Sequence, residues 1–274
     1  MAVEVVCDED PGRVLHEAGA FLASDPVRHN LILTLLHARV AYPEPGRYWV
    51  ARDGDTVVGV VFQSPLHFFA SLTPTSPEAV AALVDAIAET AVTLPGVNGE
   101  AATAARFAGQ WTERVGSAAF PVEGQRIYEL TRTPRATAAD GRMRRATLDD
   151  RGLVLAWTRS FFTDVGEEAR GLEPMVGRRL EAGHFWLWED GGPVSMAANP
   201  EPVEGVVRVQ GVYTPPERRN RGYAGARVAS LSRRMQEAGH RCLLYTALGN
   251  PTSNSVYRRI GYRAVAEGLR YRFT

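Results

Sequence analysis

Apolar residues in the second half of the chain gather into short segments of two kinds. Some are continuous runs bounded by glycine, proline or aspartate, which is typical of strands. Others repeat apolar residues at helical spacing and begin or end at capping residues. The predicted strands are Met143–Thr147, His184–Trp188, Pro193–Ala198, Val206–Tyr213, Cys242–Thr246 and Ala264–Phe273, and the predicted helices are Asp149–Ser160, Pro174–Ala182, Ala224–Ala238 and Pro251–Ile260.

The resulting order, β-α-α-β-β-β-α-β-α-β, predicts a mixed α/β sandwich. The first half of the chain has a similar order with weaker signals. Between the halves, Thr131–Gly141 is small, polar and without periodicity, which favours a linker. We therefore predict domains over residues 1–130 and 142–274, joined by residues 131–141. The elements predicted in the first half are helices at Pro11–Ser24, Val27–Ala38, Pro77–Val92 and Ala101–Val115, and strands at Tyr48–Arg52, Thr56–Gln63, His67–Leu72 and Arg126–Leu130.

Composition restricts the class of protein. The chain has 274 residues, 45% of them hydrophobic and 23% charged, which is typical of a globular protein large enough for two domains. Basic and acidic residues both number 31, so the zero net charge disfavours a nucleic-acid partner. Cys7 and Cys242 lie far apart and lack zinc spacing, so we expect no metal. The chain lacks a signal-like or membrane-length apolar run, and we expect a cytoplasmic protein with no membrane partner.

One short basic segment stands between the predicted strand Val206–Tyr213 and the helix after it. It reads Arg219-Asn220-Arg221-Gly222-Tyr223-Ala224. The first turn of a helix carries free N–H groups and partial positive charge, and glycine lets an anion approach the backbone. The two arginines suit phosphate oxygens. The segment therefore predicts a cradle for a diphosphate, the alternative being a basic helix end exposed to solvent.

A second motif surrounds the predicted helix Pro251–Ile260. Asn250 precedes the helix, and Ser253 and Tyr257 share one of its faces. Each has a structural alternative: Asn250 is also a good N-cap, Ser253 a partner of that cap, and Tyr257 a core aromatic residue.

Together these motifs, [Q/R]xxGx[G/A] at Arg219–Ala224 and NxxSxxxYxxxGY from Asn250, resemble those of the GCN5-related N-acetyltransferases (GNATs). Over residues 142–274 the resemblance implies the acyl-CoA N-acyltransferase fold. The similar element order of the first half suggests two tandem copies. No basic, glycine-containing loop follows His67–Leu72, so the N-terminal copy is predicted to be degenerate.

The resemblance also implies roles for individual residues. The N–H groups of Val212, Tyr213 and Thr214 would line the pantetheine and acetyl group and stabilise an oxyanion, which makes Tyr213 a catalytic candidate. Tyr257 would face the sulfur as proton donor, and is the other catalytic candidate. Gly211 would mark a bulge in this strand, or is a packing glycine. The cofactor-binding candidates are Val212, Tyr213, Thr214, Arg219, Asn220, Arg221, Gly222, Tyr223, Ala224, Asn250 and Ser253.

The implied activity is transfer of an acetyl group from acetyl-CoA to a primary amine of a small molecule or protein. The alternatives are an acyl-CoA sensor without turnover and a tandem acetyltransferase like mycothiol synthase. The retained phosphate loop favours an acyl-CoA donor over an aminoacyl-tRNA. Oligomer formation is left open. The sequence identifies neither the acceptor nor the general base, for which the carboxylates near the site are Glu167, Glu168, Glu173, Glu201 and Glu204.

Overall fold

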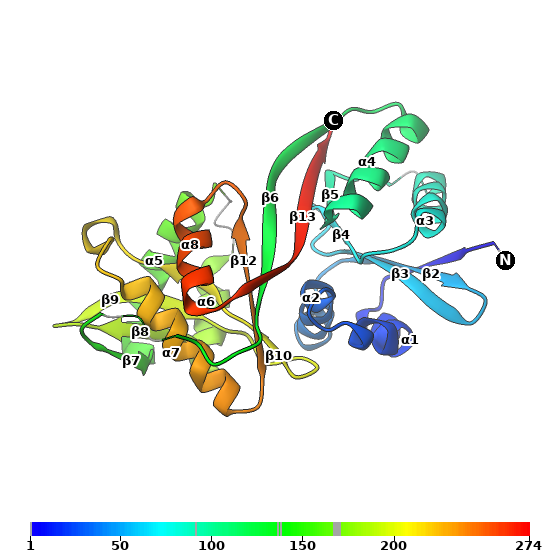
Figure 1. The fold of residues 1–274 in the computed structure, drawn as a ribbon. Helices are drawn as coiled ribbons and strands as arrows, with labels where there is room; N and C mark the ends of the chain where they lie inside the picture. Colours follow the sequence, from blue (N-terminus) through cyan, green and yellow to red (C-terminus); the bar gives the residue numbers. More distant parts are fainter. Residues whose placement is uncertain (1, 91, 136, 138, 167–170) are drawn as a thin grey trace. The chain divides into compact units, whose positions relative to one another are not determined.

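The computed structural model describes residues 2–90, 92–135, 137, 139–166 and 171–274. The chain divides into two compact units, one formed by residues 1–127, 246–250 and 264–274, the other by residues 128–245 and 251–263. Figure 1 follows the chain through both. No helix in the described ranges is long and apolar enough to cross a membrane.

The described residues of the first half, up to residue 130, form ten helices and strands. Its sheet order in the first unit is β1-β2-β3-β4-β5-β13, with β4 and β5 parallel and the other neighbours antiparallel. The elements are β1 (Glu4–Asp8), α1 (Pro11–Ser24), α2 (Asn30–Ala41), β2 (Arg47–Asp53), β3 (Thr56–Gln63), β4 (Ala70–Leu72), α3 (Pro77–Glu89), β5 (Gly96–Glu100), α4 (Ala101–Val115) and β6 (Ala119–Leu130).

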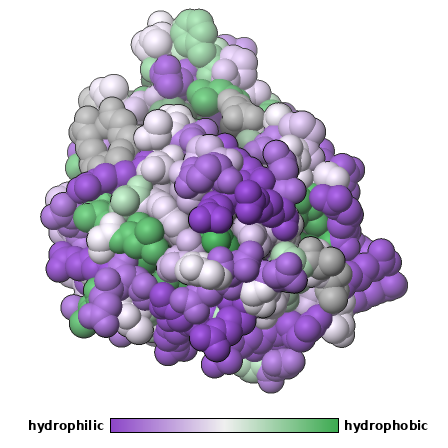
Figure 2. Space-filling model, turned by 90° about the vertical axis from the view of Figure 1, so that its left-hand side faces the viewer, coloured by the Kyte–Doolittle hydropathy of each residue, from purple (hydrophilic) through white to green (hydrophobic). Residues whose placement is uncertain are grey.

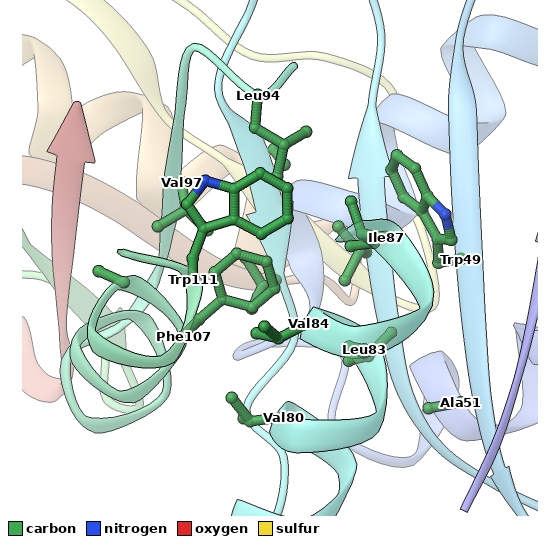
Figure 3. Close-up of a cluster of buried hydrophobic side chains, with 14 of the residues drawn as sticks. Trp49, Ala51, Val80, Leu83, Val84, Ile87, Leu94, Val97, Phe107 and Trp111 are labelled. Carbon is green, nitrogen blue, oxygen red and sulfur yellow. The ribbon is translucent and has the colours of Figure 1, made fainter. Parts of the chain in front are cut away.

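The core of the first unit is formed by α3 and α4 against the sheet (Figure 3). Val80, Leu83 and Ile87 recur at helical spacing, so α3 presents one continuous apolar stripe inward. Phe107 and Trp111 of α4 stack with their ring centroids 6.0 Å apart. This unit therefore has a hydrophobic core of its own.

The second half has a similar order of elements. They are β7 (Arg142–Arg145), η1 (Leu148–Asp150), α5 (Arg151–Asp164), α6 (Leu172–Glu181), β8 (Phe185–Glu189), β9 (Pro193–Ala198), β10 (Val206–Arg208), β11 (Gln210–Tyr213), η2 (Pro216–Arg218), α7 (Tyr223–Glu237), β12 (Arg241–Ala247), α8 (Pro251–Ile260) and β13 (Arg263–Phe273). The strands β10 and β11 stand where the first half has β4 alone. An antiparallel sheet runs β11-β9-β8-β7, and β10 pairs in parallel with β12.

Two cores lie on opposite faces of these strands. Phe185 and Leu187 pack with residues of α5 and α6, whereas Trp186, the residue between them, packs with α7 and α8. This alternation is that of a strand covered on both faces. On the face shown in Figure 2, hydrophilic side chains predominate and hydrophobic ones form separate small areas.

The structure confirms the mixed α/β fold and the predicted order, and it corrects several details. Val206–Tyr213 is not one strand, because it divides at Val209 into β10 and β11, which pair with different neighbours. Strands β1 and β5 were not predicted. The compact units also differ from the predicted domains, since residues 264–274 group with the first unit and residues 128–130 with the second.

The described residues of the predicted linker, 131–135, 137 and 139–141, form neither helix nor strand and belong to the second unit. Gln236 of α7 donates hydrogen bonds from Nε2 to the carbonyl oxygens of Leu130 and Arg132, at 3.2 and 3.1 Å. Trp188 donates from Nε1 to the carbonyl oxygen of Asp140 at 2.8 Å. The described residues of this segment are therefore attached to the second unit.

Candidate functional site

The candidate site in the second unit lies where the chain stops pairing with β12 and begins to pair with β9. Residues Val206–Arg208 pair with β12, and the N–H of Val209 donates to the carbonyl oxygen of Leu243 at 2.8 Å. From Gln210 onward the chain pairs with β9 instead. The backbone of β11 therefore separates from β12 at this point. Its N–H and C=O groups take no part in the parallel pairing.

A bulge follows directly after the parting. Gln210 is opposite Ala198 and Tyr213 is opposite Met196, so β11 advances three residues while β9 advances two. Gly211 has a φ of 57°, in the left-handed region that glycine adopts readily. Gly211 and Val212 thus lie in the irregular stretch, which agrees with the bulge at Gly211 that the family resemblance implied and not with the alternative of a packing glycine.

The loop Arg219–Ala224 leads from η2 into α7. Asn220 and Gly222 have φ values of 63° and 81°, and Gly222 is the N-cap of α7 without any side-chain cap. Within the described part of the chain, no acceptor is found for the backbone N–H groups from Asn220 to Gly225. Consecutive free N–H groups at a helix N-terminus form a concavity that binds anions.

The side chains of this loop differ in what they do. Arg219 donates from Nε to the carbonyl oxygen of Thr214 at 3.0 Å and from Nη2 to Asp164 at 2.6 Å. Its guanidinium is thus engaged in holding the loop to β11 and α5, instead of facing an anion. Arg221 is exposed. Ala224, at the second position of α7, has no side chain beyond Cβ to obstruct the N-terminus.

The side chain of Tyr223 is directed at the β8–β9 turn, and its hydroxyl also interacts with the Arg221 side chain. Its ring packs in a small core with Trp188 and Val194, and its hydroxyl donates to Asp190 at 2.5 Å. The hydrogen bond to this carboxylate raises the pKa of the phenol. Tyr223 therefore offers an anion only its backbone N–H, and its side chain fixes the start of α7 to the β8–β9 turn.

Tyr213 is similarly limited to its backbone. Its ring is buried in the core beneath α5, 6.1 Å from the ring of Trp157. The neighbouring Val212 and Thr214 are half-buried. Any contribution of Tyr213 to chemistry would come from the peptide groups of β11.

Tyr257 lies on the inner face of α8 and is 6% exposed. Its ring makes edge contacts with Tyr128 and Tyr262. Burial raises the pKa of its phenol, while the charge of Arg227 and a hydrogen bond with Ser253 act in the opposite direction. Tyr257 is both a core residue and a protonated phenol. The two interpretations of this residue from the sequence, a core aromatic residue and a proton donor, are therefore compatible.

The second motif is only partly assembled within one unit. Ser253 and Tyr257 meet one turn apart on α8. Asn250 immediately precedes α8, and its backbone N–H donates to the carbonyl oxygen of Ala247 at 3.1 Å. It falls in the segment 246–250, which groups with the first unit.

Sequence reasoning did not identify Arg227, which is completely buried in α7. Its Nε donates to Ser195 Oγ at 3.1 Å, and Ser195 Oγ in turn lies 2.9 Å from the carbonyl oxygen of Tyr213 and 2.8 Å from Thr214 Oγ1. Within the described residues, Nη1 and Nη2 of Arg227 have no partner. The available signal was a charge on an otherwise apolar helix face, between Ala226 and Val228.

The structure does not single out a general base. Glu173 pairs with Arg159 at 2.9 Å, and Glu201 lies 2.9 Å from the Nε2 of His184. Glu204 occupies a left-handed backbone position with a φ of 48°. Glu167 and Glu168 lie outside the described residues. Within the described ranges, no three His, Cys, Asp or Glu side chains are grouped so that they could hold a metal ion.

The corresponding helix start in the first half, that of α3, is capped by a side chain. There α3 follows β4, as α7 follows β11, but Ser76 caps α3 by accepting from the N–H of Ala79 at 3.2 Å. The N–H of Thr75 donates to Thr103 Oγ1 at 3.4 Å. The start of α3 is thus satisfied by its own chain, whereas the start of α7 is left open.

Comparison with known proteins agrees with this geometry. An acetyltransferase of the GNAT family from Colwellia psychrerythraea is 10% identical and has a TM-score of 0.66, with 99% of this chain and 100% of that chain covered. A GCN5-related N-acetyltransferase from Sphaerobacter thermophilus is 13% identical with a TM-score of 0.66, covering 98% and 95% of the respective chains. No curated protein matches the sequence.

The whole chain has the fold of the GNAT superfamily. Within it, residues 191–271 match the family model described as FR47-like protein. This segment contains the bulged strand, the open N-terminus of α7 and Tyr257. The predicted fold class is therefore confirmed.

Proposed function

We propose that the second unit transfers an acetyl group from acetyl-CoA to a primary amine. The observation that carries the proposal is the open N-terminus of α7, where the N–H groups of Asn220 to Gly225 lack acceptors in the described structure. Such a concavity suits a diphosphate, because the N–H groups and the helix dipole both favour negative charge. Arg221, exposed beside it, adds a cation.

Binding and orientation would be divided between three elements. The loop and the first turn of α7 would hold the diphosphate, with Arg219 fixing the loop to β11. The place where β11 separates from β12 would admit the pantetheine arm, with Ser253 beside it. Backbone N–H groups of Val212, Tyr213 and Thr214 would then polarise the thioester carbonyl and stabilise the oxyanion.

Beyond binding and orientation, the reaction requires two proton transfers. The amine attacks the carbonyl carbon, a C–N bond forms, the C–S bond breaks, and the amine loses a proton while the sulfur gains one. Tyr257 is suited to supply that proton, because burial raises the pKa of its phenol and keeps it protonated at neutral pH. The amine's own proton would leave by a base that we do not assign.

Release of free thiol from acetyl-CoA, followed over a panel of amines and amino acids, tests the proposal. We expect thiol release that depends on the amine and forms the N-acetyl product in equal amount. The chain contains no lysine, so acetylation of its own side-chain amines cannot imitate turnover. Acetyl-CoA binding without turnover on any amine would indicate a sensor instead, and absence of binding would refute the site itself.

We propose further that the first half is a degenerate copy of the same fold. Its element order is similar to that of the second half, while the start of α3 is capped by Ser76. The two solved GNAT structures cover both halves, which agrees with a tandem arrangement.

A further inference from the structure

Two polar side chains lie on the face of β10 and β11 opposite α7. Val207 and Val209 point into the core shared with α7 and α8. Because neighbouring strand residues face opposite sides, Arg208 points toward α5 and α6. Its Nε donates to Gln210 Oε1 at 3.2 Å, which brings Gln210 to the same side. This polar pair lies where β11 leaves β12.

Strand β12 contributes an aromatic wall to the same face. Cys242 and Leu244 belong to the core beneath α7, so Tyr245 points to the other side. The guanidinium carbon of Arg208 lies 5.4 Å from the ring centroid of Tyr245. The pair is therefore bordered by an aromatic ring on one side and by the bulge at Gly211 on the other.

Helix α6 brings a further cation to this cluster. Arg179 is half-buried, and its side chain makes no hydrogen bond or ion pair with any described residue. Burial and the neighbouring charges of Arg208 and Arg178 lower its pKa to about 10. Cations that repel one another in a half-buried position are costly unless an anion joins them.

Gln210 offers a second unused donor. Its Oε1 accepts from Arg208, which orients the amide, while its buried Nε2 has no partner among the described residues. A buried N–H group left unpaired costs about 1–3 kcal/mol. The unused groups of Arg179 and Gln210 are therefore all hydrogen-bond donors. They lie next to β11, the strand whose N–H groups would face the thioester.

We propose that the acetyl acceptor is an amine that also carries an oxyanion, a carboxylate or phosphate, bound by Arg179 and by Nε2 of Gln210. This inference rests on the proposed function and specifies its substrate class. Amine and oxyanion belong to one small molecule, because the cluster adjoins Gly211, where the amine would have to attack. The oxyanion would offset the repulsion between the arginines and satisfy the free amide donor.

Matched acceptor pairs provide the test. Lysine and cadaverine differ by a carboxylate, and O-phosphoethanolamine and ethanolamine differ by a phosphate. We expect the anionic member of at least one pair to have a kcat/KM greater by about tenfold or more, since hydrogen bonds to charged groups have this strength. The pair that shows the preference distinguishes carboxylate from phosphate. Equal kcat/KM within both pairs would overturn the inference while leaving acetyl transfer intact.

Variants show whether the preference comes from this cluster. Arg179→Gln should remove the preference by raising KM for the acceptor that carries the oxyanion, with little effect on the acceptor that lacks it, and Arg179→Lys should restore part of the preference. Arg151→Gln changes an exposed arginine of α5 and serves as the control for charge in general. A preference that persists in Arg179→Gln would overturn the assignment of Arg179.

A binding measurement separates this inference from the proposed function. Inorganic phosphate should raise the Tm of the unmodified protein more than that of Arg179→Gln, because the α7 site is the same in both. The difference between the two Tm shifts can be measured even if no amine is acetylated. Absence of acetylation would refute the proposed function but not the oxyanion site. Equal Tm shifts in the two proteins would refute the oxyanion site.

Discussion

Arg227 and Ser195 form a buried pair in which one Nε–H donates to one hydroxyl oxygen across 3.1 Å, and the rest of the guanidinium has no partner among the described residues. Burial lowers the pKa of Arg227 to about 9. An unpaired buried cation reduces stability, so its presence beside Tyr257 and the end of β11 indicates a functional purpose.

We therefore expect Arg227→Met to stabilise the fold and impair the reaction. Replacing the buried charge with an apolar side chain of similar length should raise the free energy of unfolding by roughly 1–3 kcal/mol. The kcat should fall, because Ser195 loses the donor that fixes it against Tyr213 and Thr214. Urea unfolding and thiol release measure the two effects, and a variant that is both less stable and equally active would contradict this interpretation.

The same residue predicts a pH dependence of stability. Between the folded pKa of about 9 and the higher, ordinary pKa of an arginine in the unfolded chain, the unfolded chain binds the proton that the folded chain has released. Stability should therefore rise with pH in this window, by the amount that the cation costs at neutral pH. Subtracting the urea-unfolding curve of Arg227→Met at each pH isolates this contribution from that of the tyrosines.

Tyr257→Phe should lower kcat by roughly 10²-fold with little change in acetyl-CoA affinity, because it removes only the proposed proton donor. Tyr262→Phe is a matched control on a neighbouring buried tyrosine. Its hydroxyl lies 2.7 Å from Ser232 Oγ, so its loss should cost about 1 kcal/mol of stability and leave kcat unchanged. An unchanged kcat in Tyr257→Phe would remove Tyr257 from the mechanism.

Arg221→Gln should weaken acetyl-CoA binding several-fold, and the difference should shrink as salt is added, since the contact is exposed. Arg218→Gln, an exposed arginine of η2, is the control. Calorimetric titration at low and high salt would compare them. Equal affinities for the two variants would mean that Arg221 does not face the phosphates.

One acetyl-CoA should bind per chain. The start of α7 is open, while that of α3 is capped by Ser76. Ser76→Ala should cost about 1 kcal/mol of stability through loss of the cap and should leave the stoichiometry at one. A second binding event per chain in calorimetry would show that the first half retains a functional site.

A fragment of residues 142–274 should not fold into a stable protein. Tyr128 and Leu130, each 1% exposed, belong to the core formed with Val228 and Tyr257, and the fragment lacks both. Removing large side chains from a packed core costs several kcal/mol apiece. A fragment of residues 119–274 retains them and should be the more structured of the two by near-ultraviolet circular dichroism. Equal signals would contradict the argument.

The starts of α7 and α8 beside the candidate site were predictable from the sequence, because one short segment marks each of them. Pro251–Ile260 was placed correctly from its proline and terminal glycine, and Gly222 from the loop pattern. Side-chain partners were not predictable in this way. Arg219 was expected to contact the phosphates, and in the structure it pairs with Asp164. This pairing could not be predicted, because Asp164 comes from the end of α5, far away in the sequence.

The missed strands have a similar explanation. β5 reads Gly-Val-Asn-Gly-Glu, which has little strand propensity of its own. It is a strand because β13 pairs with it, Tyr271 opposite Val97. A Cβ at Gly96 would collide with the carbonyl oxygen of Tyr271, so the glycine that weakens the prediction is required by the pairing.

Because β13 belongs to the first unit, the sheet of that unit can be completed only after the ribosome has synthesised the second unit. The ribosome finishes β5 early, but its partner β13 follows only after the whole second unit. At about 5–20 residues per second, the nascent first unit would keep an incomplete sheet edge for on the order of ten seconds. An unpaired edge is an aggregation hazard. This interval, more than the finished protein, is where a chaperone would be needed.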